Sequence, residues 1–197
     1  MSVANLIIFF STFTKLPVSI EDIKDQIVES GFTDAIRFIP MDVPEEHLLG
    51  MMVRLKFCPG VYAQSEICSL IFYNKNSHNY QQKFTCVKEM IHIVENPILA
   101  ISDKDKLNGL LSGLIHIANG NPLSPENLDA FLDEAATFQA LAVLVPHETR
   151  EDIAPLYKAG KVSTKELSDW FEIPEEYVDL VMDERWERIR TMILALN

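Results

Sequence analysis

The sequence predicts an α+β protein in which a small antiparallel sheet packs on a helical bundle and a helical unit follows at the C-terminal end. Three observations support this class. Short runs rich in β-branched and aromatic residues lie early in the chain, longer segments with helical spacing of apolar residues follow, and 48% of the 197 residues are hydrophobic. That content is enough for a sizeable core and too high for a disordered chain.

The first apolar run, Leu6 to Phe10, is too short for a membrane span or for the apolar part of a signal peptide, and no basic segment precedes it. We expect a buried first helix or strand there. Ser19 and Asp22 have the spacing of a helix N-cap and its partner, and Gly31 provides a stop. This pattern predicts a capped helix between them.

Three strands are predicted at residues 35–39, 50–57 and 66–73. Pro59-Gly60 stands between the second and the third and is typical of a turn, so we expect these two strands to form an antiparallel hairpin. A polar loop at residues 74–82 should follow the hairpin.

A helix is predicted next, from about Phe84 to Glu95, and Pro97 should end it. Its apolar residues form one stripe: Phe84, Val87, Ile91 and Val94. Two further helices are predicted, one from Ser102 and Asp105 to about Gly120 and one from Ser124-Pro125 to Pro146.

A change of composition after Pro146 divides the chain into residues 1–146 and an acidic helical unit, residues 147–197, with 12 acidic and 7 basic side chains. Ser163 to Glu166 has the pattern of a capping box that begins a short helix ending at Phe171. Pro174 begins a longer helical segment that should break near Asp183. These proportions resemble a helix-turn-helix, but the second helix carries acidic side chains where a DNA-reading helix needs cations.

The net charge of −12 and the pI near 4.8 make nonspecific binding to nucleic acid or to an anionic membrane unfavourable and favour a basic protein partner. The three cysteines, Cys58, Cys68 and Cys86, cannot all pair and show no C-x-x-C spacing. We therefore expect free, buried thiols and a cytoplasmic protein.

Residues 88–92, Lys-Glu-Met-Ile-His, match the zinc signature H-E-x-x-H except that Lys88 stands in place of the first histidine. In the intact signature both histidines bind zinc and the glutamate acts as general base. Glu89 and His92 keep those two residue types. The Lys88 ammonium has no lone pair and repels a dication.

The order of these motifs resembles the ImmA/IrrE family of metallopeptidases, which cut helix-turn-helix repressors. The resemblance covers roughly Leu16 to Trp186. It rests on Lys83 to His92, which is similar to the family's R-F-T-x-A-H-E-x-x-H, on Glu134 to Phe138 (E-A-x-x-F), on the ending Leu144-Val145-Pro146, and on STKELSDWFEIPEEYVDLV. It implies a zincin-like fold, a third zinc ligand at Glu134, and a repressor or another prophage or mobile-element regulator as the partner.

The chain departs from the family pattern at Lys88 and in the spacing of the later helix, which is one position longer. Alignment on Phe138 puts Glu134 at the ligand position, whereas alignment on Pro146 puts Ala135 there. One residue corresponds to about 100° of helix rotation. Both alignments remain open at this stage.

Three functions follow as hypotheses. In the first, the chain has lost its zinc, the Lys88 ammonium lies near Glu89 and Glu134 in its place, no cofactor is bound, and the protein acts by binding a partner. In the second, it is a divergent zinc endopeptidase with Glu89 as general base and His92 and Glu134 as ligands. In the third, it is a plain interaction protein with a residual motif. His116, on the helix between the two motif helices, is expected to be a packed side chain and not a substitute ligand. His147 is expected to be a loop residue at the N-terminal end of the next helix.

Overall fold

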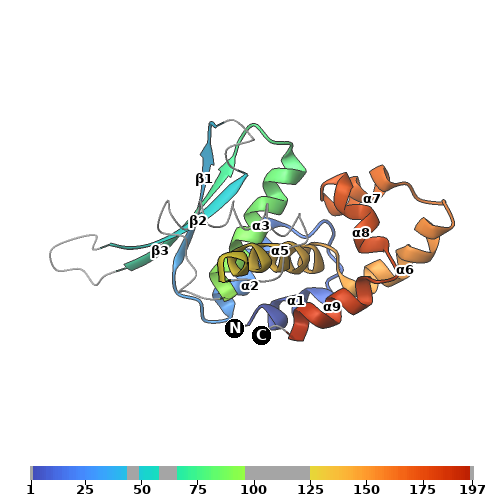
Figure 1. Cartoon of the computed structure of the whole chain (residues 1–197), viewed down its shortest axis with the longest axis horizontal. Helices are drawn as coiled ribbons and strands as arrows, with labels where there is room; N and C mark the ends of the chain where they lie inside the picture. The colour runs from blue at the N-terminus through green and yellow to red at the C-terminus, as the bar shows by residue number, and fades with distance from the viewer. Residues whose placement is uncertain (1, 44–48, 58–65, 96–124, 196–197) are drawn as a thin grey trace.

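The computed structural model describes residues 2–43, 49–57, 66–95 and 125–195. Within these ranges the chain forms one three-stranded sheet, eight α-helices and one short 3-10 helix (Figure 1). The predicted class, a small sheet combined with many helices, is confirmed. The predicted helix over 102–120 with His116, the Pro59-Gly60 turn and Cys58 lie outside the described residues.

The sheet is mixed. Its strands β1 (Ala35–Met41), β2 (Gly50–Phe57) and β3 (Glu66–Asn74) lie in the order β1-β3-β2. β2 and β3 are antiparallel, with Gly50 opposite Tyr73, as the predicted hairpin requires. β1 runs parallel to β3, with Ala35 opposite Cys68, so the prediction of an antiparallel sheet was wrong for this pair. Residue type favours a strand but does not set its direction, which depends here on the chain crossing over β3 between β1 and β2.

Helix α3 (Asn79–Glu95) packs on β2 and β3, and α2 (Ile20–Glu29) packs against α3. The predicted capping box is present on α2: the Ser19 hydroxyl accepts from the Asp22 amide at 3.0 Å, and the Asp22 carboxylate accepts from the Ser19 amide at 3.2 Å. α3 begins at Asn79, five residues before the predicted start at Phe84. The prediction missed this first turn because its residues are polar and do not extend the apolar stripe.

The N-terminal run is a helix, α1 (Val3–Ser11), which buries Leu6, Ile7 and Phe10 on one side. α1 contacts the long helix α5 (Pro125–Leu144), and α5 also packs against α3 (Figure 1). From Ala135 onward α5 buries most of its side chains, which explains the apolar sequence of its second half.

The C-terminal unit consists of α6 (His147–Lys158), α7 (Thr164–Phe171), the 3-10 helix η1 (Glu175–Tyr177), α8 (Val178–Met182) and α9 (Trp186–Ala195). The capping box of Ser163 and Glu166 is present, and the predicted break near Asp183 separates α8 from α9. Both predictions are confirmed.

One buried cluster of apolar side chains runs through the described part of the molecule, from Ile71 in the sheet to Leu141 on α5 and Trp186 on α9. The described cysteines, Cys68 and Cys86, are free and buried, as predicted. The domain boundary at residue 146 stays a prediction, since residues on both sides of it contribute to the same core. None of the helices in the described ranges is long and apolar enough to cross a lipid bilayer.

Candidate functional site

Helix α3 brings the altered zinc motif to the junction of the sheet and α5. Val87, Met90 and Ile91 turn into the core with no exposed surface. Lys88 and His92 stand one helical turn apart, so they lie on the same side of α3. Their side chains are 17% and 19% exposed, and that of Glu89 is 6% exposed. The motif is therefore largely shielded from solvent.

Asp133 of α5 is the residue that joins this cluster from the opposite helix. The Lys88 Nζ donates to Asp133 Oδ1 at 2.6 Å, and His92 Nε2 lies 3.4 Å from the same oxygen. Lys88 Nζ also lies 3.7 Å from Glu89 Oε1, and His92 Nδ1 lies 3.7 Å from Glu95 Oε2. We call these five residues, Lys88, Glu89, His92, Glu95 and Asp133, the Lys88 cluster.

Glu134, the ligand that the family resemblance implied, is exposed and lies outside the cluster. Ala135, the alternative position, is buried and has no donor atom. Asp133 is the α5 residue that faces Lys88, whereas the two alignments place Glu134 or Ala135 there. The hypothesis that Lys88 faces Glu134 was therefore wrong by one residue. One residue is about 100° of helix rotation, which is enough to turn a side chain from solvent to the interhelical contact.

The burial of two alanines on α5 explains why Asp133, and not Glu134, faces α3. Ala136 and Ala140, three and seven positions later, are fully buried, and this spacing places Asp133 on the same inward face. Small residues on that face allow α5 to approach α3 closely. Alignment to the family motif passes over Asp133, because the family has a glutamate as its third zinc ligand.

The electrostatics of the cluster keep both basic groups charged at neutral pH. Burial lowers the pKa of His92, but the nearby carboxylates of Asp133, Glu95 and Glu89 outweigh burial and raise the pKa to about 9. Burial likewise lowers the pKa of Lys88, and the charges of Glu89 and Asp133 overcome it and raise the pKa above its ordinary value. The reverse holds for Asp133: burial raises its pKa, whereas His92 and Lys88 together lower it to about 2.

Glu89 lies between α3 and the edge strand β2. A Cβ added to Gly50 would lie 3.3 Å from Glu89 Oε1 and 2.2 Å from the Thr85 methyl carbon, so glycine is needed where β2 passes α3. Burial, and secondarily the Glu89 charge, raises the pKa of the Cys86 thiol to about 12. Cys86 is therefore a protonated thiol at neutral pH and not a nucleophile.

The C-terminal unit approaches the cluster through Tyr177. Its ring packs on Phe84 with ring centroids 4.6 Å apart. Burial and, secondarily, the charges of Glu176 and Asp133 raise the pKa of its hydroxyl, and the Lys88 charge opposes them. At the start of α3, the buried Lys83 donates to Glu172 Oε2 at 2.8 Å. These contacts connect η1 and the end of α7 to the helix that carries the motif.

The donor set of the Lys88 cluster does not fit a catalytic zinc ion. Such an ion needs three protein ligands with lone pairs and an open position for water. Here the ammonium of Lys88 binds Asp133 Oδ1 at 2.6 Å, so a cation already occupies the carboxylate oxygen that lies 3.4 Å from His92 Nε2, and Lys88 itself offers no lone pair. What the arrangement provides is a buried ionic network in which two cations balance carboxylates from α3 and α5.

Comparison with protein-family models gives no match for this chain, and comparison with curated proteins gives none either.

Proposed function

We propose that this protein is metallopeptidase-like, that the Lys88 ammonium has replaced the catalytic zinc, and that it acts by binding a regulatory partner instead of cutting one. The observation that carries the proposal is the 2.6 Å hydrogen bond from Lys88 Nζ to Asp133 Oδ1. A zinc ion held by residues 88, 92 and 133 would bind that same oxygen.

Two features support a zincin-like origin. His92 Nε2 and Asp133 Oδ1 are 3.4 Å apart, close to the separation of two ligand atoms around one tetrahedral zinc, which is about 3.3 Å for bonds of about 2.0–2.1 Å. The motif helix α3 also packs on the edge strand β2, with Gly50 against Glu89. In this proposal, Lys88 keeps α3 and α5 together by charge, as the metal would have done.

The proposed partner is a basic protein, and the family resemblance suggests a helix-turn-helix repressor or another regulator of a prophage or mobile element. The net charge of −12 supports this choice, because opposite charge accelerates association with a basic partner and weakens binding to nucleic acid. We propose neither direct contact with nucleic acid nor contact with a membrane, and we place the protein in the cytoplasm.

The test replaces Lys88 with histidine and measures bound zinc by plasma mass spectrometry. Lys88→His restores the first histidine of the signature, so the variant should hold one zinc per chain more than the wild type and melt at a higher temperature with zinc. Adding Asp133→Ala to this variant should remove the gain, whereas adding Glu134→Gln should leave it. No gain in Lys88→His would refute the idea that Lys88 occupies a former metal position.

The same experiment tests the alternative function, that of a divergent zinc endopeptidase. If the wild-type protein holds a zinc ion that His92→Ala removes, Lys88 has not displaced the metal and the proposal fails. A purified helix-turn-helix repressor gives a second readout. The proposal expects a salt-sensitive complex with intact repressor, and repressor fragments that disappear in Glu89→Gln would support the endopeptidase.

A further inference from the structure

A second group of polar side chains lies in the C-terminal unit, away from the Lys88 cluster. His147 is the first residue of α6, directly after Pro146. Its Nδ1 is buried and has no hydrogen-bond partner. The nearest carboxylate oxygen that the structure pairs with it is Glu187 Oε2 of α9, 3.6 Å away, which is beyond hydrogen-bonding distance. A buried nitrogen left without a hydrogen bond needs a physical explanation.

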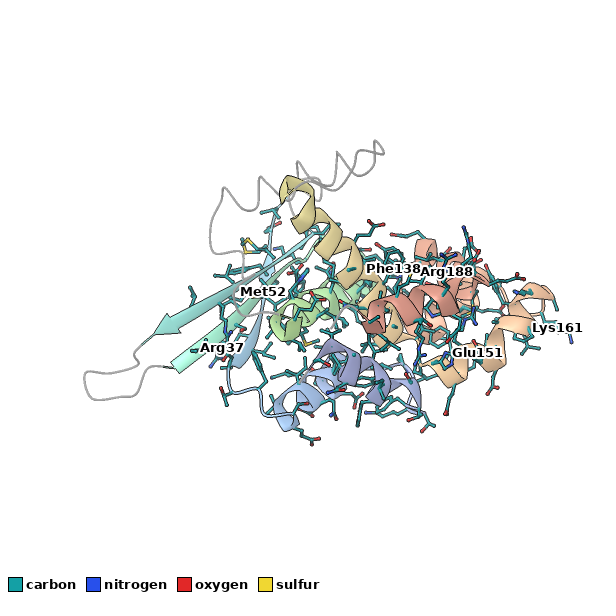
Figure 2. All side chains as sticks on the ribbon, turned by 60° about the horizontal axis from the view of Figure 1, so that its bottom comes forward. Arg37, Met52, Phe138, Glu151, Lys161 and Arg188 are labelled. Carbon is teal, nitrogen blue, oxygen red and sulfur yellow. The ribbon has the colours of Figure 1, made fainter. Side chains whose placement is uncertain are left out.

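Glu151 completes the group. It lies one helical turn after His147 on α6, so both side chains project on the same side, and its position is labelled in Figure 2. One ligand atom from each of His147, Glu151 and Glu187 can be chosen so that all three lie within 4.8 Å of one another. Ligand atoms around a tetrahedral zinc are about 3.3 Å apart. The side chains of Glu151 and Glu187 are 51% and 54% exposed, so both have room to rotate toward an ion.

Two arginines contact these glutamates, and each has other partners. Arg150 pairs with Glu151, and it also donates to the carbonyl oxygens of Val181 at 3.0 Å and Asp183 at 2.7 Å. It therefore stays anchored if Glu151 turns toward an ion.

Arg190 behaves in the same way. It donates to Ser11 Oγ at 2.9 Å and lies 3.8 Å from Glu187 Oε1. That contact leaves Oε2, the oxygen nearer His147, for an ion. The nearby positive charges of both arginines should keep the affinity for a dication modest.

We propose that His147, Glu151 and Glu187 bind one zinc ion, with the fourth position open to water. An imidazole with two carboxylates is a common donor set for this metal. The ion would satisfy His147 Nδ1 and would join α6 to α9, the first and last helices of the C-terminal unit. This site is independent of the function proposed above, since it shares no residue with the Lys88 cluster.

The experiment titrates zinc into chelator-treated full-length protein, followed by calorimetry and thermal unfolding. We expect one zinc per chain and a melting temperature raised by about 5 °C when free zinc is about a hundred times the dissociation constant. His147→Ala and Glu187→Gln should each weaken binding at least tenfold. Glu148→Gln is the matched control, because Glu148 is exposed on the next position of α6, and it should bind zinc like the wild type.

Absence of zinc binding by the wild-type protein would overturn this inference, and so would equal binding by His147→Ala. His92→Ala, run in parallel, separates the two sites. Zinc that is lost in His92→Ala but kept in His147→Ala belongs to the Lys88 cluster, which refutes both this inference and the loss of metal proposed above. Zinc that is lost in His147→Ala alone supports the inference.

Discussion

Asparagine in place of Asp133 tests whether this carboxylate holds the Lys88 cluster together. The substitution keeps the shape of the side chain and one oxygen for Lys88, so the packing of α5 against α3 should not change. What it removes is the negative charge that Lys88 and His92 share through one oxygen atom. The two cations would then be left with the carboxylates on α3 alone.

The magnitude follows from the pKa of His92. A rise from 6.5 to about 9 corresponds to an upper limit of about 3 kcal/mol of folding free energy, at about 1.4 kcal/mol per pKa unit. Removing one partner of a buried ion pair costs about 3–5 kcal/mol. Because the side chains here keep 17–22% of their surface exposed, we expect Asp133→Asn to cost about 3 kcal/mol near pH 6.

The pH dependence of the stability difference provides a second, independent test of this prediction. His92 has a raised pKa in the folded state, so its contribution is fully present below pH 6.5 and is lost as the pH rises through about 9. The stability gap between wild type and Asp133→Asn should therefore narrow between pH 6.5 and pH 9. The part due to Lys88 should persist across this range, because its pKa is also raised.

Urea unfolding followed by circular dichroism at pH 6, 7.5 and 9 measures both effects. A loss of about 3 kcal/mol should move the wild-type midpoint down by roughly 1–2 M. Glu134→Gln is the control one residue away, and since Glu134 is exposed it should change stability by less than about 0.5 kcal/mol. Equal effects of the two substitutions, or a gap that widens with pH, would refute the assignment of Asp133 to the cluster.

Two further predictions concern the contacts that position α3. Lys83→Met should cost about 1 kcal/mol in urea unfolding, because it removes the part-buried hydrogen bond to Glu172, whereas Lys75→Met, at an exposed pair, should have no measurable effect; equal effects would contradict the role of Lys83. Gly50→Ala should cost about 2 kcal/mol, because the new Cβ meets the Thr85 methyl carbon at 2.2 Å. Thr85→Ser removes that methyl group and should restore at least about 1 kcal/mol in the double variant, and strictly additive losses would show that the contact is not the cause.

The local parts of this fold were predictable from the sequence. Ser19 with Asp22 and Ser163 with Glu166 are capping boxes whose hydrogen bonds join residues three apart, so four letters are enough to place a helix start. The break near Asp183 and the antiparallel pairing of β2 with β3 are also short-range features. The motif on α3 could be read in the same way, because its residues stand within one turn of each other.

The candidate site needed contacts between segments far apart in the chain. Lys88 and Asp133 are 45 residues apart, and nothing in the letters around residue 133 says which of two adjacent carboxylates faces α3. That choice depends on how α5 rotates to bury Ala136 and Ala140, and a rotation of about 100° exchanges one acidic residue for the next.

The sequence by itself determined that Lys88 stands where the H-E-x-x-H signature has its first histidine, and it determined the acidic charge and most helix and strand positions. Tertiary structure alone decided that β1 runs parallel to β3, that Asp133 and not Glu134 meets Lys88, and that His147 meets Glu187. The physical reason is common to all three. Capping and periodicity act through hydrogen bonds within a few residues, whereas strand direction, helix rotation and interhelical pairs are fixed by the packing of the whole core.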